Sequence, residues 1–72
     1  MAYATNSIAS RIDWCHRQKT QARTQLEREG WQAEEDGLED ALLNIRYYEK
    51  QYQDYPPCVF KRYVMGFRMG KR

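Results

Sequence analysis

Apolar and aromatic side chains return every third or fourth position between residues 38 and 55. The positions that repeat in this way are Leu38, Ala41, Ile45, Tyr48, Tyr52 and Tyr55, with Leu42 beside them. This spacing gathers side chains on one face of an α-helix. Pro56 and Pro57 follow at once and cannot extend a helix, because proline has no backbone N–H to donate. We therefore expect a helix over 38–55, capped by Asp36, with one face that must be buried.

An earlier seam of apolar and small residues precedes this stripe. Its positions are Ile8, Ile12, Cys15, Ala22 and Leu26. Lys19 stands at the one position of the repeat that is neither apolar nor small. Ser10 and Asp13 have the spacing of a capping box, which marks the first turn of a helix. We therefore expect the first helix to begin near Ser7. We expect this helix to end at Gly30, because glycine readily adopts the left-handed conformation that terminates a helix. An end at Asp36–Gly37 is the alternative.

Two amphipathic helices with a short connection pack side by side in opposite directions. We therefore predict an all-α fold, an antiparallel helical hairpin. The residues after Pro57 fit a short third helix, because their apolar positions do not alternate as in a strand. Gly66 and Gly70 then indicate a flexible basic tail over 66–72, which leaves residues 1–65 as a single small helical domain.

Little in the sequence points to catalysis. Only eleven of the 72 residues are Leu, Ile, Val or Phe, and one domain of this size has no room for separate catalytic and regulatory modules. Cys15 and His16 are adjacent, so on a helix they point about 100° apart and lack an orienting group. The carboxylates at 34–36 lie in a polar run with nothing to desolvate them. We expect a non-enzymatic binding protein with no cofactor.

The sequence also lacks the spacing of a metal site and of a membrane segment. Two cysteines and one histidine do not form a zinc-ligand pattern. No run of 18 apolar residues and no basic and apolar leader occurs. We expect a cytoplasmic protein that binds no metal and contacts no membrane.

The formal net charge of +2 is the balance of three blocks of opposite sign. Residues 1–26 carry +3, residues 27–54 carry −6 and residues 55–72 carry +5. In the predicted hairpin the acids crowd the tip and the cations gather at the other end. The expected result is an electric dipole that orients the molecule on a charged partner, with an effect screened over about 8–10 Å at physiological salt.

The candidate partner-binding residues are cations outside the acidic block and aromatic residues off the two seams. They are Tyr3, Arg11, Trp14, Arg17, Tyr47, Lys61, Arg62, Arg68, Lys71 and Arg72. The segment 58–72 holds five cations and no acid, with Phe60, Tyr63 and Phe67 among them. Such a mixture binds phosphates and stacks on bases, or docks on an acidic protein groove. For Phe60 and Tyr63 we favour a structural role, in which they close the open end of the hairpin.

In its size, its tyrosine and tryptophan content and its segregated charge, the chain resembles the small bacteriophage host-takeover proteins that bind bacterial RNA polymerase as inhibitors or antiterminators. The resemblance implies a small regulator that binds a host macromolecular machine, RNA polymerase first among them, and modulates transcription in the host cytoplasm. Two alternatives stay open. One is a nucleic-acid-binding protein that acts through residues 58–72. The other is a helical homo-oligomer in which the seams pair between chains and Lys19 sets their register.

Overall fold

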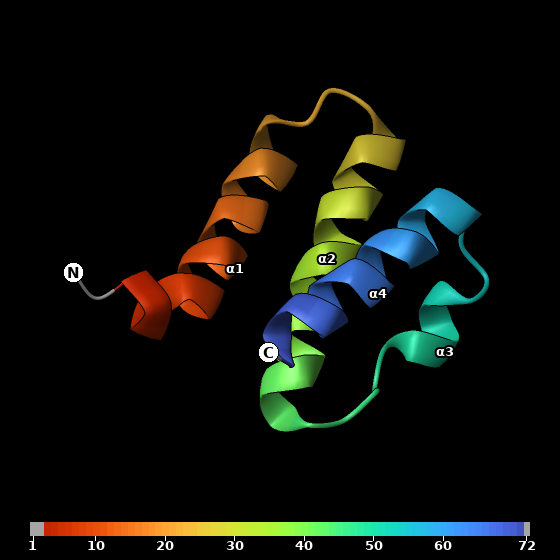
Figure 1. Cartoon of the computed structure of the whole chain (residues 1–72). Helices are drawn as coiled ribbons and strands as arrows, with labels where there is room; N and C mark the ends of the chain where they lie inside the picture. The colour runs from red at the N-terminus through yellow and green to blue at the C-terminus, as the bar shows by residue number, and fades with distance from the viewer. Residues whose placement is uncertain (1–2, 72) are drawn as a thin grey trace.

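The computed structural model describes residues 3–71, with side chains from Ile8 onward, and contains four helices in this range. They are α1 (Tyr3–Gln21), α2 (Gln25–Leu43), α3 (Glu49–Tyr52) and α4 (Pro57–Gly70). Figure 1 shows α1 and α2 side by side in opposite directions, with α4 crossing α2 on the near side. The all-α fold and its antiparallel hairpin are thus confirmed. None of these four helices is both long and apolar enough to cross a membrane.

The turn of the hairpin lies at residues 22–24, so both predicted turns, at Gly30 and at Asp36–Gly37, are wrong. A capping box at Thr24 starts α2. The Thr24 hydroxyl accepts a hydrogen bond from the Glu27 backbone N–H (3.1 Å), and the Glu27 carboxylate accepts one from the Thr24 N–H (3.2 Å). Two otherwise unpaired donors of the first turn are satisfied in this way.

The predicted start of the first helix is also wrong. Helix α1 begins at Tyr3, four residues before Ser7, and Ser10 lies inside it. The inward face of α1 agrees with the predicted seam as far as Lys19, since Cys15 is buried and Ile8, Ile12 and Lys19 are half-buried. The last two seam positions lie outside α1: Ala22 is in the turn, and Leu26 is exposed on α2. The periodicity therefore found the buried face of α1 and missed both of its ends.

The predicted helix over 38–55 does not exist as one element. Helix α2 ends at Asn44, which adopts the left-handed conformation with φ 57° and ψ 42°. Asparagine tolerates this conformation better than most residues, so it terminates helices much as glycine does. The remainder of the stripe lies in a loop and in the four-residue α3. Asp36, expected as a cap, is buried in the middle of α2.

A helix does follow the prolines, as predicted, and Pro57 is its first residue. It is not short, however, and continues to Gly70. Residues 66–70, expected in a flexible tail, form its last turn and a half, and Gly66 is buried. Arg72 lies outside the described residues.

Glycines set how closely α2 and α4 approach each other. A Cβ added to Gly37 would collide with the backbone carbonyl oxygen of Tyr63 and lie 2.8 Å from the backbone nitrogen of Phe67. A Cβ added to Gly66 would collide with the backbone carbonyl oxygen of Glu34. The two helices therefore touch backbone to backbone, which needs residues without a Cβ at both positions.

The core is small and rich in tyrosine. Ala33, Tyr52, Val59 and Tyr63 form its buried cluster, and half-buried residues, namely Tyr48, Tyr55, Phe60 and Val64, pack around it. The ring of Tyr63 stacks on that of Tyr52, with centroids 5.5 Å apart. Phe60 and Tyr63 therefore have a structural role, as expected, but they pack along α2 beside Tyr52 and do not close the open end of the hairpin.

Candidate functional site

Three carboxylates of α2 point into the molecule, contrary to the expected acidic tip. Glu34 is 0% exposed, Asp40 1% and Asp36 6%. Helix α2 is the central helix, packed on α1 on one side and on α4 on the other. Acids on its inward faces must therefore meet partners from the neighbouring helices, because an unpaired buried charge is very costly.

Glu34 joins three helices through two arginines. Arg11 of α1 donates from Nε to Glu34 Oε2 at 2.5 Å. The Nη2 atom of Arg62, on α4, lies 2.8 Å from Glu34 Oε1. The guanidinium of Arg62 also lies over the Trp31 ring, 4.2 Å from its centroid. Arg11 and Arg62, both predicted to bind a partner, are thus engaged in holding α1 and α4 onto α2.

The other two buried acids accept hydrogen bonds from tyrosines. Tyr52 donates to Asp36 Oδ2 at 2.6 Å, and Tyr63 donates to Asp40 Oδ2 at 2.7 Å. Burial raises the pKa of Asp36 from its ordinary value, against the lowering effect of the hydrogen bonds from Tyr52 and Gln32. Asp40 also accepts a hydrogen bond from the Tyr48 backbone N–H at 2.9 Å, which anchors the loop before α3.

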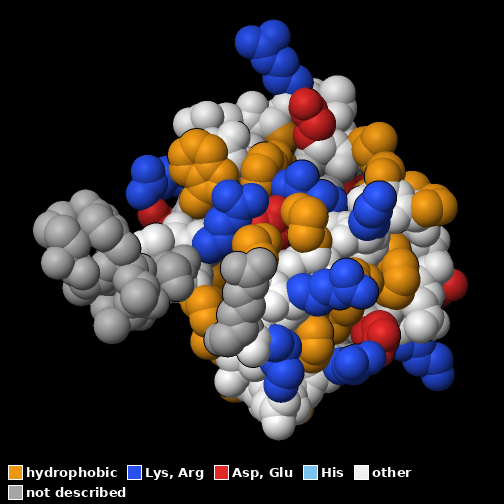
Figure 2. All heavy atoms as spheres, in the orientation of Figure 1, with side chains coloured by type: hydrophobic (Ala, Val, Ile, Leu, Met, Phe, Trp, Pro, Cys, Tyr) orange, Lys and Arg blue, Asp and Glu red, His pale blue; other side chains and the backbone are white. Residues whose placement is uncertain are grey.

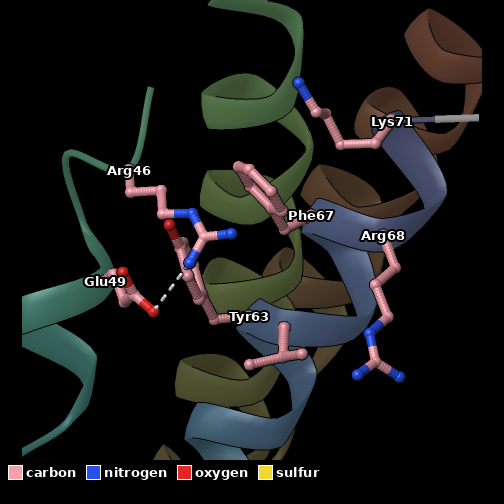
Figure 3. A pocket seen from close by; sticks show the side chains of 7 residues that line it. Arg46, Glu49, Tyr63, Phe67, Arg68 and Lys71 are labelled. Carbon is pink, nitrogen blue, oxygen red and sulfur yellow. Dashed lines mark hydrogen bonds and ion pairs between the residues drawn. The ribbon is translucent and has the colours of Figure 1, made fainter. Parts of the chain in front are cut away.

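This framework shapes a pocket of about 400 Å³ on the outer side of α4. We call it the cationic pocket, and it is lined by Arg46, Glu49, Tyr63, Val64, Phe67, Arg68 and Lys71. In Figure 3 the side chains of Arg46 and Lys71 extend toward the Phe67 ring, while Arg68 extends away on the other side of α4. The Arg46 guanidinium lies 5.1 Å and the Lys71 Nζ 5.8 Å from the Phe67 ring centroid. Three cations and one carboxylate thus line this site, and the charged groups of two of these cations, Arg46 and Lys71, lie near the Phe67 ring.

The last residues of α2 and the loop that follows expose large apolar side chains on either side of Arg46 in the chain. We call these residues the apolar segment: Leu42 (56% exposed), Leu43 (68%), Ile45 (44%) and Tyr47 (73%). Arg46, which lines the pocket, lies between Ile45 and Tyr47 in the chain. Large apolar side chains that gather on a surface commonly mark a binding site. Figure 2 shows Lys and Arg side chains spread over the face that carries α4.

The remaining predicted site residues divide between surface and undescribed positions. Tyr47 belongs to the apolar segment, and Arg68 and Lys71 line the cationic pocket. Lys61 is exposed on α4 and Trp14 on α1, where Arg17 forms an ion pair with Asp13. Tyr3 begins α1, but its side chain, like Arg72, lies outside the described residues. The structure thus brings the predicted cations together in two pairs, Arg11 with Arg62 at Glu34 and Arg68 with Lys71 at the cationic pocket.

Five residues of the pocket lining were not among the predicted site residues, namely Arg46, Glu49, Tyr63, Val64 and Phe67. Arg46 was counted in the acidic middle block, and Phe67 was assigned to the tail. Asn44 was the available signal, because a helix end there turns the chain and returns Arg46 toward α4.

The pair Cys15 and His16 does not form a nucleophile and base. Cys15 is fully buried, and that burial, with the nearby Glu34, raises the pKa of its thiol to about 12. His16 is exposed, and its Nδ1 lies 3.9 Å from Glu35 Oε1. A neutral buried thiol is neither a good nucleophile nor a metal ligand.

Comparisons with known proteins add no family to this description. No protein-family model, no curated protein and no solved structure matches the chain.

Proposed function

We propose that this is a non-enzymatic regulatory protein that docks on a protein surface of a macromolecular machine through the apolar segment and the cationic pocket. The observation that carries the proposal is the exposure of Leu42, Leu43, Ile45 and Tyr47 at the end of α2 and in the loop that supplies Arg46 to the cationic pocket. Protein interfaces are enriched in aromatic residues and arginine, whose burial supplies most of the binding energy. The matching partner surface is an apolar groove with an acidic rim.

Bacterial RNA polymerase is the machine that we propose as the partner, with modulation of transcription initiation or antitermination as the result. The support is the resemblance in size and charge segregation to small phage proteins that bind this enzyme, and a large assembly offers many acidic and apolar grooves. The proposal includes a cytoplasmic location, in the host cytoplasm if the chain is phage-encoded.

Nucleic acid is the second candidate partner, since Lys61, Arg68 and Lys71 are all exposed along α4. The aromatic residues support it less. Tyr63 is 2% exposed and stacks on Tyr52, so it has no free face for a base. Leucine and isoleucine, which dominate the apolar segment, have no role in phosphate binding. A gel shift with single-stranded and duplex DNA at about 50 mM salt tests this candidate.

Direct binding to purified RNA polymerase tests the main proposal. Core enzyme and holoenzyme are immobilised, and the wild-type protein is compared with Leu43→Glu by biolayer interferometry. Leu26→Glu is the matched control, since Leu26 is 48% exposed at the opposite end of α2. We expect Leu43→Glu to weaken binding at least about tenfold, because a carboxylate would then meet an acidic rim.

Two outcomes would contradict the proposal. If the wild-type protein shows no binding to either form of the enzyme at micromolar concentrations, RNA polymerase is not the partner. If Leu26→Glu weakens binding as much as Leu43→Glu, the apolar segment is not the docking surface.

A further inference from the structure

We infer that the cationic pocket receives an acidic side chain of the protein partner, and that Glu49 occupies the Arg46 guanidinium until that side chain displaces it. The inference rests on the proposed function, because it specifies the partner chemistry of the same surface. The cations of the pocket would strengthen binding of the partner, whereas the Glu49 carboxylate would weaken it by competing with the partner's carboxylate for Arg46.

The charge and size of the pocket favour an anion of side-chain dimensions. Arg46, Arg68 and Lys71 outnumber the single carboxylate of Glu49. The side chain of Arg68 makes no ion pair or hydrogen bond with any residue whose side chain the structure describes. A volume of about 400 Å³ lies within the range of pockets that hold small ligands or a few side chains. The floor, formed by Val64 and Phe67, suits the methylene groups of an inserted glutamate.

The ion pair between Arg46 and Glu49 is weak enough to be exchanged. Its single contact joins Arg46 Nη1 and Glu49 Oε2 at 3.5 Å, and the two side chains are 64% and 32% exposed (Figure 3). Exposed pairs of this kind contribute little to stability. A guanidinium has five N–H donors in a planar fork, so most of those of Arg46 are free to bind a carboxylate in bidentate fashion.

A carboxylate from a protein explains the site better than a nucleotide does. The Phe67 ring already has two cations near it, Arg46 and Lys71, at 5.1 and 5.8 Å from its centroid, so a base would have to displace them in order to stack. Arg46 is also flanked in the chain by the exposed Ile45 and Tyr47, which suit an apolar protein surface. An acidic residue set among apolar residues is therefore the expected recognition element.

Fluorescence anisotropy with a defined probe tests this inference. The probe is a labelled peptide in which glutamates alternate with leucines, and its counterpart has glutamine in place of every glutamate. A labelled oligothymidylate of matched charge serves as the nucleic-acid arm. The proteins are the wild type, Glu49→Gln and Arg46→Gln. Asp54→Asn is the control for loss of a carboxylate and Lys61→Gln the control for loss of a cation, because both residues are exposed and neither lines the pocket.

We expect Glu49→Gln to bind the acidic peptide about two- to fivefold more tightly than the wild type, the range set by the strength of an exposed ion pair. Arg46→Gln should bind the acidic peptide at least about fivefold more weakly than the wild type does. The glutamine peptide should not distinguish the wild type, Glu49→Gln and Arg46→Gln. The control variants should differ from the wild type by less than twofold in about 150 mM salt, where distant charges are screened.

Three results would overturn the inference. Unchanged or weaker binding by Glu49→Gln would show that Glu49 does not compete, and an equal gain with Asp54→Asn would show that only net charge matters. Preference for the oligothymidylate with the same dependence on Arg46 would make nucleic acid the occupant. The proposed function fails separately: if the acidic peptide behaves as expected and RNA polymerase does not bind, the pocket chemistry stands and the partner is another protein.

Discussion

Tyr63 of α4 donates its phenolic hydrogen to Asp40 of α2, with 2.7 Å between the oxygens, in a site that is closed to solvent. Tyr63→Phe removes the donor and leaves the buried carboxylate with the Tyr48 backbone N–H as its remaining partner. Hydrogen bonds to charged groups contribute about 1.5–3 kcal/mol, so we expect a loss of about 2 kcal/mol in the free energy of unfolding, measured by urea denaturation. Tyr47→Phe, at an exposed residue, should change it by less than about 0.5 kcal/mol. Equal effects would contradict the role of this bond.

Gly37 and Gly30 provide a matched pair of substitutions in one helix. A Cβ at Gly37 would collide with the Tyr63 backbone, whereas a Cβ at Gly30 would only touch Arg62 Cγ at 3.7 Å. Gly37→Ala should destabilise the protein by at least about 2 kcal/mol, because α4 must move away from α2. Gly30→Ala should leave stability unchanged or raise it by up to about 1 kcal/mol, since alanine favours the helix. Thermal unfolding followed by circular dichroism compares them, and a stable Gly37→Ala variant would refute the close backbone contact.

Arg11 attaches α1 to the rest of the molecule through the buried Glu34. Arg11→Met removes that partner and leaves Glu34 with Arg62, so we expect a loss of about 2–3 kcal/mol, less than for a fully buried pair because Arg11 is partly exposed. Hydrogen exchange should show that the amides of α1 lose protection before those of α2 and α4. Arg17→Met, which breaks only the exposed pair with Asp13, should cost less than about 0.5 kcal/mol. Uniform loss of protection in all helices would argue against a separate attachment.

Asp36 predicts how stability depends on pH. Burial raises its pKa in the folded protein, so the folded state binds its proton more tightly than the unfolded chain does. The contribution of this group is therefore most favourable below the unfolded pKa of about 3.9 and is lost as pH rises through the folded pKa. Asp36→Asn removes the titration and keeps an acceptor for the Tyr52 hydroxyl.

The measurement is the difference in unfolding free energy between Asp36→Asn and the wild type. We expect this difference to shift in favour of the variant as pH rises from 4 to 7, in urea titrations at each pH. Glu39→Gln, on the same helix, is the comparison: burial also raises the pKa of Glu39, which is less buried than Asp36, so its difference should shift in the same direction by a smaller amount. A difference that stays constant over this range, or that shifts in favour of the wild type, would show that the pKa of Asp36 is not raised.

Periodicity predicted the helices as elements better than it predicted their limits. The seam through Ile8, Ile12 and Cys15 faces inward, and the tyrosines at 48, 52 and 55 pack in or around the core. The predicted helix ends were wrong because the hydrophobic repeat continues past the residues at which the helices end. Leu26 fits the spacing of the first seam although the chain turns at 22–24, and Ile45 fits that of the second although Asn44 ends α2. At each of these positions a local feature determines the helix end: the capping box at Thr24 starts α2, and the left-handed Asn44 terminates it.

The candidate site was harder to predict for a different physical reason. A hydrophobic pattern treats carboxylates as solvent-facing, yet Glu34, Asp36 and Asp40 are buried because partners far along the chain pair with them. The same pairings engage Arg11 and Arg62, which looked free in the sequence. Arg68 and Lys71 were anticipated as binding residues. Phe67 adjoins them on α4, whereas Arg46 reaches the same site only because the chain turns at Asn44 and folds back toward α4.

The glycine contact between α2 and α4 explains how a chain with few aliphatic and phenylalanine residues can fold. Where Gly37 and Gly66 let two backbones touch, there is little interior volume left for side chains to fill. Of the eleven aliphatic and phenylalanine residues only Leu38 and Val59 are buried, and small and tyrosine side chains fill the rest of a narrow interior. Tolerance to substitution should therefore depend on the space around a residue more than on its hydrophobicity. Gly37 and Gly66 should be among the least replaceable residues, whereas the exposed Leu42 and Leu43 should be replaceable with little loss of stability.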